Sequence, residues 1–247
     1  MKTILIPIDF QSASVTAIAY AKALYKKENV HVQLLHVMPE LNENLQIQAY
    51  NQFKTLQETI LKDWHAHVKL SVTSGKIIEK IQEAIKQVKP QLVLIGLTGK
   101  TMVKELLKLT DAPVLIIPKG NNKTNIENIV YANDFKEIQV GNALEPLRDV
   151  AQSSKAKVDV LHIEKEFKPK ADEAEESLEY YLELVNHEYV FIKSDDFPSA
   201  IQDYVHKNKI DLLTLLLRDH GQNENNSKGK LVARLLEETD VPILSLV

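Results

Sequence analysis

Apolar residues along this chain gather in short continuous runs that are separated by amphipathic stretches. The first half holds four such runs, at residues 4–8, 30–37, 68–72 and 92–95. Runs of this kind are typical of parallel strands buried on both faces of a sheet. Between them, apolar side chains recur at helical spacing over 12–27, 43–65 and 77–88. Alternating strands and helices predict an α/β fold with parallel strand pairing.

The predicted helix over 43–65 rests on the spacing of Tyr50, Phe53, Leu56, Ile60 and Trp64. Ser12 and Ser14 precede the apolar stripe of the helix over 12–27, where a hydroxyl can cap the first turn.

The stretch from Gln91 to Pro118 packs strand, turn, helix and strand into one short segment. The run ending at Ile95 leads into a turn, Gly96-Leu-Thr-Gly99-Lys100-Thr101, and then into a helix. Free backbone N–H groups, a lysine and the positive end of a helix dipole make such a turn a plausible phosphate cradle.

The same order of elements then starts again. Ile4 to Phe10 matches Ile129 to Phe135, residues 34–37 match 160–163, and Asp111-Ala-Pro113 matches Asp240-Val-Pro242. Two copies of a whole domain indicate a duplication rather than a solenoid of short repeats. We therefore expect two domains, 1–120 and 125–247, with a patternless linker near 118–125.

Composition narrows the possible functions. The chain has no cysteine, which excludes disulfides, thiolate zinc sites and cysteine nucleophiles. Its net charge of −4 argues against a general nucleic-acid binder. The first 120 residues carry 15 Lys/Arg and 10 Asp/Glu, and the remainder 15 and 24, so the halves are oppositely charged. The first apolar run stops at Asp9, too short for a signal peptide, and no run is long enough to span a membrane, so we expect a cytoplasmic protein.

Several motifs together resemble the universal stress proteins. They are Pro7-x-Asp9-Phe10 after the first strand, LLHV in the second, the G-x-x-G turn, and the closing strand APVLIIP. The resemblance covers nearly all of both halves, so the chain is similar to a tandem member. It implies two five-stranded parallel sheets of order 3-2-1-4-5, of the adenine nucleotide alpha-hydrolase-like kind. In this family domains pair through their last strands, which implies pairing within this chain, or a homodimer.

By the same resemblance, ATP or another adenine nucleotide would bind at the carboxyl ends of the strands, where the strand order reverses. Asp9 would meet adenine or ribose, Val37 would offer backbone groups to the base, and Gly96 and Gly99 would cradle phosphates. The complete set of predicted site residues is Pro7, Asp9, Val37, Gly96, Gly99, Lys100 and Thr101.

The family's ATP pattern, G-x2-G-x9-G-(S/T), is damaged in both halves. In the first half Lys100-Thr101 stands where the final Gly-Ser/Thr belongs, so the nine-residue spacer is missing. In the second half Leu216 and Asp219 replace the turn glycines, and Gly229-Lys230 lacks the hydroxyl. We therefore expect the second domain to be degenerate.

Each feature also has a purely structural interpretation. Leu94 stands where a P-loop needs glycine, so the turn is either a shortened phosphate turn or a plain tight turn. Asp9 can cap the next helix instead of contacting a ligand. His36 and His162 are interpreted as packed strand-end histidines. His65-x-His67 lacks a third ligand for zinc, and the acidic run 172–179 is interpreted as a solvated helix face.

No recognisable nucleophile motif is present, so we expect neither catalytic residues nor an enzyme. The sequence predicts a stress-response or regulatory module whose first domain binds an adenine nucleotide. The main alternative is an ATP-independent protein-interaction module with vestigial sites, and slow ATP hydrolysis is a third.

Overall fold

The computed structural model describes residues 1–247 except 98–99, 134–140, 166–177 and 217–227. The chain divides into two compact units, Met1–Thr124 and Asn125–Val247, and each is described by itself. Within the described ranges, no helix combines the length and the apolar character needed to cross a membrane.

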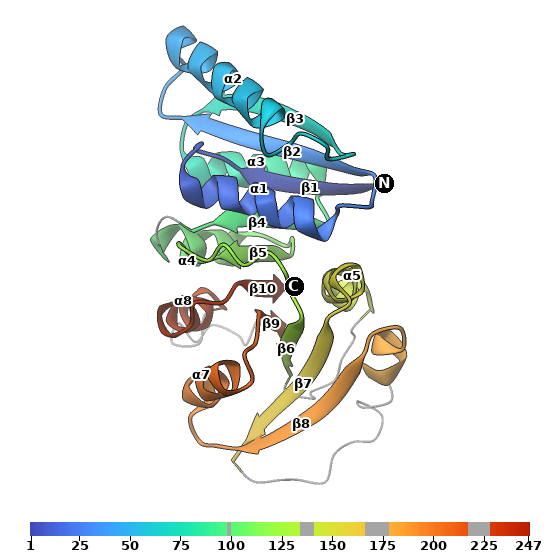
Figure 1. The fold of residues 1–247 in the computed structure, drawn as a ribbon. Coiled ribbons are helices and arrows are strands. Elements are labelled where there is room, and N and C mark those ends of the chain that lie inside the picture. The colour runs from blue at the N-terminus through green and yellow to red at the C-terminus, as the bar shows by residue number, and fades with distance from the viewer. Residues whose placement is uncertain (98–99, 134–140, 166–177, 217–227) are drawn as a thin grey trace. The chain divides into compact units, whose positions relative to one another are not determined.

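The first unit is a five-stranded parallel sheet with helices on both faces (Figure 1). Its strands are β1 (Lys2–Pro7), β2 (Val30–Met38), β3 (His67–Ser74), β4 (Leu92–Gly96) and β5 (Val114–Ile117). Its helices are α1 (Ser12–Leu24), α2 (Glu43–Glu58), α3 (Ile77–Val88) and α4 (Lys100–Leu109). The strand order is β3-β2-β1-β4-β5, with every neighbouring pair parallel.

The second unit repeats this arrangement. Its strands are β6 (Asn128–Ala132), β7 (Lys157–Glu164), β8 (His187–Lys193), β9 (Leu212–Leu216) and β10 (Ile243–Leu246). They lie in the order β8-β7-β6-β9-β10, again parallel. Its described helices include the 3₁₀ turn η1 (Gly141–Leu144), α5 (Glu145–Ser154), α7 (Phe197–Lys207) and α8 (Lys228–Glu238). Each unit therefore has five parallel strands in the order 3-2-1-4-5, which confirms the predicted fold class.

The core of the first unit follows from its apolar runs. Ile4, Leu5 and Ile6 of the central strand β1 are all 0% exposed, as expected for a strand covered on both faces. Ala17 and Ala21 on α1 are also fully buried, because their small side chains let the helix lie close to the sheet. Figure 1 shows α1 and α3 on opposite faces of this sheet.

One predicted helix is wrong at its C-terminal end. The helix expected over 43–65 is α2, which ends at Glu58. Thr59 has non-helical dihedral angles, and the chain then turns, so Trp64 lies in a loop, where it is buried. Tyr50, expected on the inner face, is 50% exposed. The packing of this loop against α1 explains why position 64 carries an apolar side chain, and no continuation of the helix is needed.

The segment that joins the two units is held at both ends. On one side, the hydroxyl of the fully buried Tyr20 lies 2.5 Å from Asn121 Oδ1 and 2.6 Å from the carbonyl oxygen of Lys123. On the other side, Asp211 Oδ2 accepts from the backbone N–H groups of Glu127 (2.9 Å) and Asn128 (3.0 Å).

Candidate functional site

A small cavity lies at the carboxyl ends of β1, β2 and β4, where the strand order of the first sheet reverses. Open α/β sheets bind ligands at this kind of place. The cavity measures about 60 Å³ and its walls are formed by Pro7, Ile8, Asp9, Ser14, Leu35, Val37, Ile77, Ile95 and Gly96. Four predicted site residues, Pro7, Asp9, Val37 and Gly96, therefore surround one space, although they come from three different strands and the loop after β1.

Asp9 organises the start of α1 at the mouth of this cavity. Its Oδ1 accepts from the Ser14 hydroxyl at 2.6 Å and from the backbone N–H of Gln11 at 2.9 Å. Gln11, the N-cap residue, makes no side-chain capping bond. Asp9 thus gives a partner to one backbone N–H at the helix start, that of Gln11, and also holds the Ser14 side chain. The capping interpretation of Asp9 is confirmed, while a ligand contact through its exposed edge stays a prediction.

Gly96 is fixed by packing against α1. A Cβ atom added to it would lie 1.9 Å from the carbonyl oxygen of Ala13, far inside any allowed contact. The first turn of α1 therefore approaches β4 as closely as it does only because position 96 has no side chain. This steric requirement accounts for the glycine by itself, and its predicted role at a phosphate stays untested.

The remaining predicted site residues lie at the turn after β4. Gly99 falls outside the described residues. Lys100 and Thr101 are the first residues of α4, so only three residues separate β4, which ends at Gly96, from this helix. The turn is as short as the missing nine-residue spacer predicts.

Phe10 and His36 stand beside the cavity and were not singled out as a pair from the sequence. Phe10 adopts a left-handed backbone conformation (φ 61°), which is strained for a bulky side chain. Its ring centroid lies 5.1 Å from that of His36. His36 Nδ1 donates to the carbonyl oxygen of Ile8 at 2.8 Å. His36 is therefore a packed strand-end histidine, as the sequence predicts.

The second unit repeats the histidine contact at the equivalent position. His162 Nδ1 donates to the carbonyl oxygen of Asn133 at 2.9 Å, and its Nε2 lies 3.5 Å from Glu164 Oε2. Leu216, which replaces a turn glycine, is the last residue of β9. Asp134 and Asp219 fall outside the described residues, as does most of the acidic run 172–179, and Gly229 and Lys230 lie in α8.

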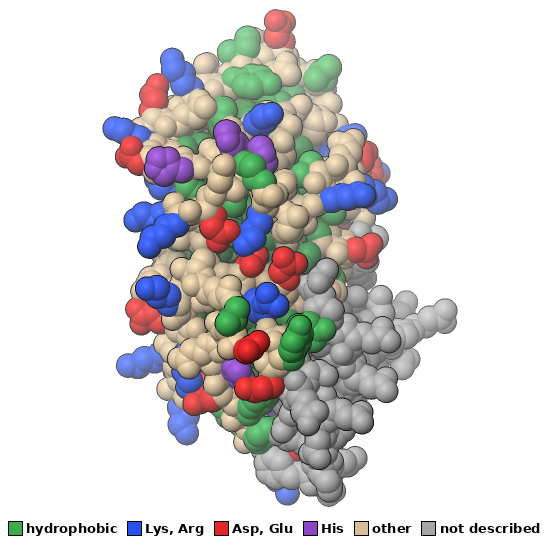
Figure 2. Space-filling model, turned by 90° about the vertical axis from the view of Figure 1, so that its right-hand side faces the viewer, with side chains coloured by type: hydrophobic (Ala, Val, Ile, Leu, Met, Phe, Trp, Pro, Cys, Tyr) green, Lys and Arg blue, Asp and Glu red, His purple; other side chains and the backbone are tan. Residues whose placement is uncertain are grey.

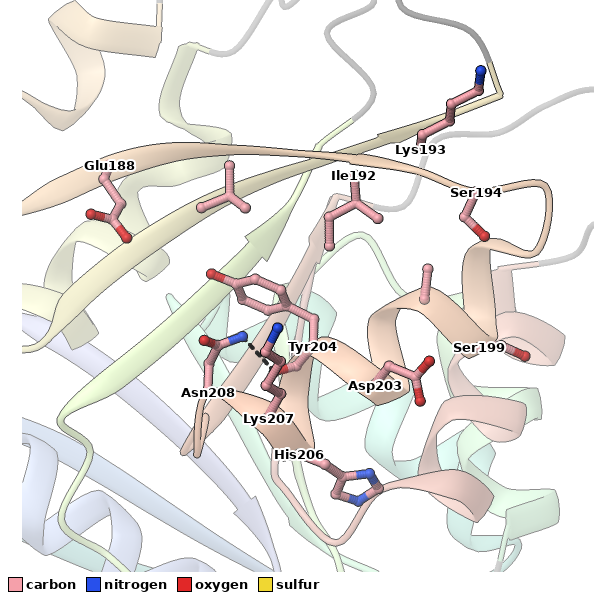
Figure 3. Close-up of a pocket in the computed structure, with 12 residues that line it drawn as sticks. Glu188, Ile192, Lys193, Ser194, Ser199, Asp203, Tyr204, His206, Lys207 and Asn208 are labelled. Carbon is pink, nitrogen blue, oxygen red and sulfur yellow. Dashed lines mark hydrogen bonds between the residues drawn. The ribbon is translucent and has the colours of Figure 1, made fainter.

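A larger cavity, of about 960 Å³, lies in the second unit between β8 and α7 (Figure 3). Val190, Ile192 and Ala200 provide its apolar surface, with Tyr204 and Glu188 towards one end. Nothing in the sequence predicted this cavity, because it depends on how β8 and α7 pack.

Polar side chains beside this cavity form a connected network. The Tyr204 hydroxyl donates to Asp159 Oδ2 at 2.8 Å, and Lys157 Nζ lies 3.1 Å from Asp159 Oδ1 and 2.5 Å from Glu188 Oε1. Burial raises the pKa of Tyr204, and the hydrogen bond to Asp159 raises it further. The hydrogen bond to Glu188 raises the pKa of Lys157. The nearly buried Asp159 carboxylate is thus compensated by a phenol and an ammonium.

Among the residues that the structure describes, no group of three or more His, Asp or Glu side chains could hold a metal ion. His65 and His67 therefore gain no third ligand there.

Comparison with known proteins relates this geometry to a family. Residues 1–117 match the model of the universal stress protein family. No curated protein sequence matches the chain. A universal stress protein from Archaeoglobus fulgidus has a similar structure, with a TM-score of 0.71 at 14% identity, over 98% of this chain and 95% of that one.

Two further solved structures resemble the whole chain. A putative universal stress protein from Pseudomonas aeruginosa aligns with a TM-score of 0.69 at 14% identity, over 100% of this chain and 93% of that one. The cytoplasmic domain of a prokaryotic cation chloride cotransporter aligns with a TM-score of 0.60 at 13% identity, over 100% and 95%. At these identities the likeness shows a shared fold across both units.

Proposed function

Because residues 1–117 belong to the universal stress protein family, we propose that this chain is a stress-response module whose first unit binds an adenine nucleotide. One observation carries the proposal: Pro7, Asp9, Val37 and Gly96 border a single cavity at the point where the strand order reverses. The base would enter beside Val37, and Asp9 would accept a hydrogen bond from the ribose or the base.

The geometry also predicts that binding is weak. Small-molecule sites usually measure roughly 300–1,000 Å³, whereas this cavity measures about 60 Å³. Its walls must therefore separate before a nucleotide fits. Ile77, the first residue of α3, forms part of the wall and is 44% exposed. The short turn before α4 leaves few backbone donors for a triphosphate. We expect a dissociation constant in the micromolar to millimolar range rather than the nanomolar range.

A second candidate function is an ATP-independent protein-interaction module. It is favoured by Gly96, whose contact with Ala13 explains the glycine without any phosphate, and by the small cavity. Slow ATP hydrolysis is a third candidate, which only a turnover assay can support.

Mass spectrometry of the natively purified full-length chain tests the proposal first, by detecting co-purified nucleotide. A thermal melt then measures binding, since a ligand at 100 times its dissociation constant stabilises the native state by about 2.7 kcal/mol. Asp9→Asn should reduce the shift while keeping an Oδ1 acceptor for the Gln11 N–H and the Ser14 hydroxyl. Asp134→Asn, at the equivalent place in the second half, is the matched control and should leave the shift unchanged. No shift at millimolar ATP would favour the ATP-independent function.

A further inference from the structure

A second hollow lies in the first unit at the amino ends of its strands, where β2 and β3 begin. It measures about 570 Å³ and is lined by Lys26, Lys27, Glu28, Asn29, His65, Ala66 and His67. We call it the histidine–lysine hollow. It is distinct from the cavity at the carboxyl ends of the strands, and the two share no lining residue.

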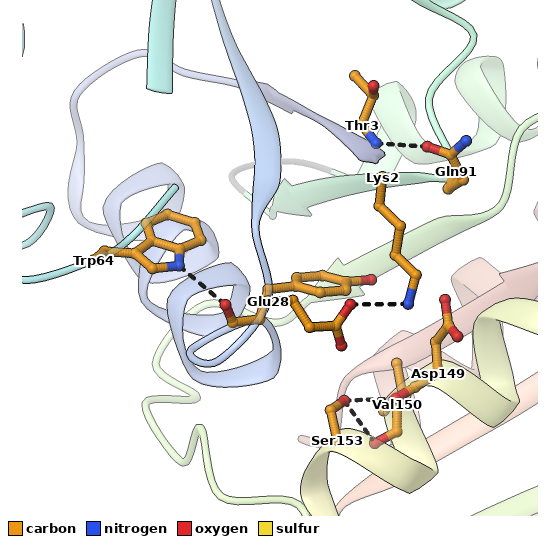
Figure 4. Close-up of polar contacts among 9 residues, drawn as sticks. Lys2, Thr3, Glu28, Trp64, Gln91, Asp149, Val150 and Ser153 are labelled. Atoms are coloured by element: carbon orange, nitrogen blue, oxygen red, sulfur yellow. Dashed lines mark hydrogen bonds and ion pairs between the residues drawn. The ribbon is translucent and has the colours of Figure 1, made fainter. Parts of the chain in front are cut away.

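The hollow is built by the loop that follows α2. Trp64 is buried in this loop, and its indole Nε1 donates to the carbonyl oxygen of Tyr25 at 3.2 Å (Figure 4). Tyr25 is the C-cap residue of α1, directly after its last residue, Leu24. This contact brings His65, next to Trp64, alongside the lysines that follow Tyr25.

The register of β2 and β3 adds a second imidazole beside His67. His31 is its partner in the ladder, and the two rings stack with centroids 5.3 Å apart and planes 30° apart. Lys69 lies two residues beyond His67, so it projects from the same face of β3. Figure 2 shows histidine and lysine side chains gathered at this end of the first unit.

The positive charge of the hollow is not neutralised within the part of the chain that the structure describes. Lys26 and Lys27 of the lining, and Lys69 outside it on β3, are exposed and make no hydrogen bond or ion pair with a described residue. Glu28 is the one acidic residue in the lining, and its Oε2 lies 3.0 Å from Lys2 Nζ (Figure 4). The loop also carries Lys62 and Asp63, both exposed.

We propose that the histidine–lysine hollow binds a small oxyanion with two or more negative charges, such as a phosphate ester or a sulfate. Its volume lies within the roughly 300–1,000 Å³ of small-molecule sites. Ammonium and imidazolium groups form charge-assisted hydrogen bonds with such oxygens. A metal ion is the weaker alternative, because no group of three or more His, Asp or Glu side chains among the described residues could hold one.

The ammonium groups of Lys26 and Lys27 are available to an anion, while Glu28 stays paired with Lys2. Since these groups face solvent, salt weakens the attraction over a Debye length of about 8–10 Å.

Calorimetric titration of the full-length chain with sodium sulfate and with pyrophosphate, at low ionic strength, tests the proposal. Lys27→Gln should weaken binding by about two- to fivefold, as expected for one exposed charged contact. His67→Gln should also weaken binding, because the imidazole of His67 lines the hollow.

Lys104→Gln is the matched control, because Lys104 is an exposed lysine on α4 outside the hollow. Thermal melts without ligand establish that each variant is folded. No heat with either anion, or equal weakening by Lys104→Gln and Lys27→Gln, overturns the proposal. So does binding of Zn²⁺ that is lost in His67→Gln while neither anion binds, or binding restricted to an RNA oligonucleotide. The nucleotide melt with Asp9→Asn is unaffected by any of these results, so the two proposals fail separately.

Discussion

The Cα of Gly96 faces the backbone carbonyl of Ala13 so closely that a Cβ atom would lie 1.9 Å from that oxygen. This contact sets how α1 rests on β4, and with it the wall of the cavity at the carboxyl ends of the strands. A glycine can be required for close packing of a helix or for close approach to a phosphate, and this contact requires Gly96 through the packing alone.

Gly96→Ala should lower the free energy of unfolding by about 1–3 kcal/mol, as overpacking of a close contact does. Because the obstacle is backbone, it cannot move aside as a flexible side chain would. Urea unfolding measures the effect. Gly120→Ala is the control: its site is open, and only the positive φ of 89° opposes the substitution, at about 1 kcal/mol. Equal costs at the two positions would contradict the packing role.

Leu35→Ala and Leu94→Ala should each destabilise the first unit by about 2–5 kcal/mol through lost burial and the cavity left behind. The two side chains are 5% and 0% exposed. Leu41, at 76% exposed, offers the same truncation outside the core, and Leu41→Ala should change the denaturation midpoint little. If all three variants melt alike, the assigned core is wrong.

Thr214 in β9 is the counterpart of Leu94, and its fully buried hydroxyl has no hydrogen-bond partner among the described residues. Thr214→Val removes that hydroxyl while keeping the shape, so it should stabilise the chain by about 1 kcal/mol. Thr214→Ser keeps the hydroxyl and loses a methyl group, so it should destabilise. A destabilised valine variant in thermal melts would mean that the hydroxyl is satisfied.

Tyr204→Phe should cost about 1–2 kcal/mol near neutral pH, because the buried Asp159 carboxylate loses its phenol donor. The folded pKa of Tyr204 is raised, chiefly by burial. Its contribution is therefore fully present below the unfolded pKa of about 10 and is lost as pH rises above that value.

The variant should accordingly lose stability less steeply than the parent chain above about pH 10, as urea midpoints across this range would reveal. Tyr180 is 74% exposed, and Tyr180→Phe serves as the control that should follow the parent curve. Parallel curves for the parent chain and Tyr204→Phe would show that this phenol is not responsible.

The fold was predictable because its strands are apolar runs and its second half repeats the first. The continuous run that became β4 and the matching Asp111-Ala-Pro113 and Asp240-Val-Pro242 carry this information locally. The end of α2 at Glu58 was not predictable from the sequence, because Trp64 fits a helical spacing as well as it fits a loop buried on α1.

The candidate site was predictable only in part. Pro7, Asp9 and Val37 lie at or just beyond the carboxyl ends of β1 and β2, which neighbour each other, and strand order alone predicts this. The contact of Gly96 with Ala13 and the strain at Phe10 depend on how α1 leaves β1. The histidine–lysine hollow was missed because Lys26 and Lys27 are far in sequence from His65 and His67, and no spacing pattern records a strand register.

The segment between the two units is anchored by Tyr20 at one end and by Asp211 at the other. Links between domains are usually the first places where proteases nick a chain, since cleavage needs several residues that can leave their contacts together. Here only Thr124, Asn125 and Ile126 stand between the anchored residues, and Ile126 is fully buried. A protease would have to break the Tyr20 or Asp211 contacts first, so the junction that looks most vulnerable in the sequence is protected by the domains that it joins.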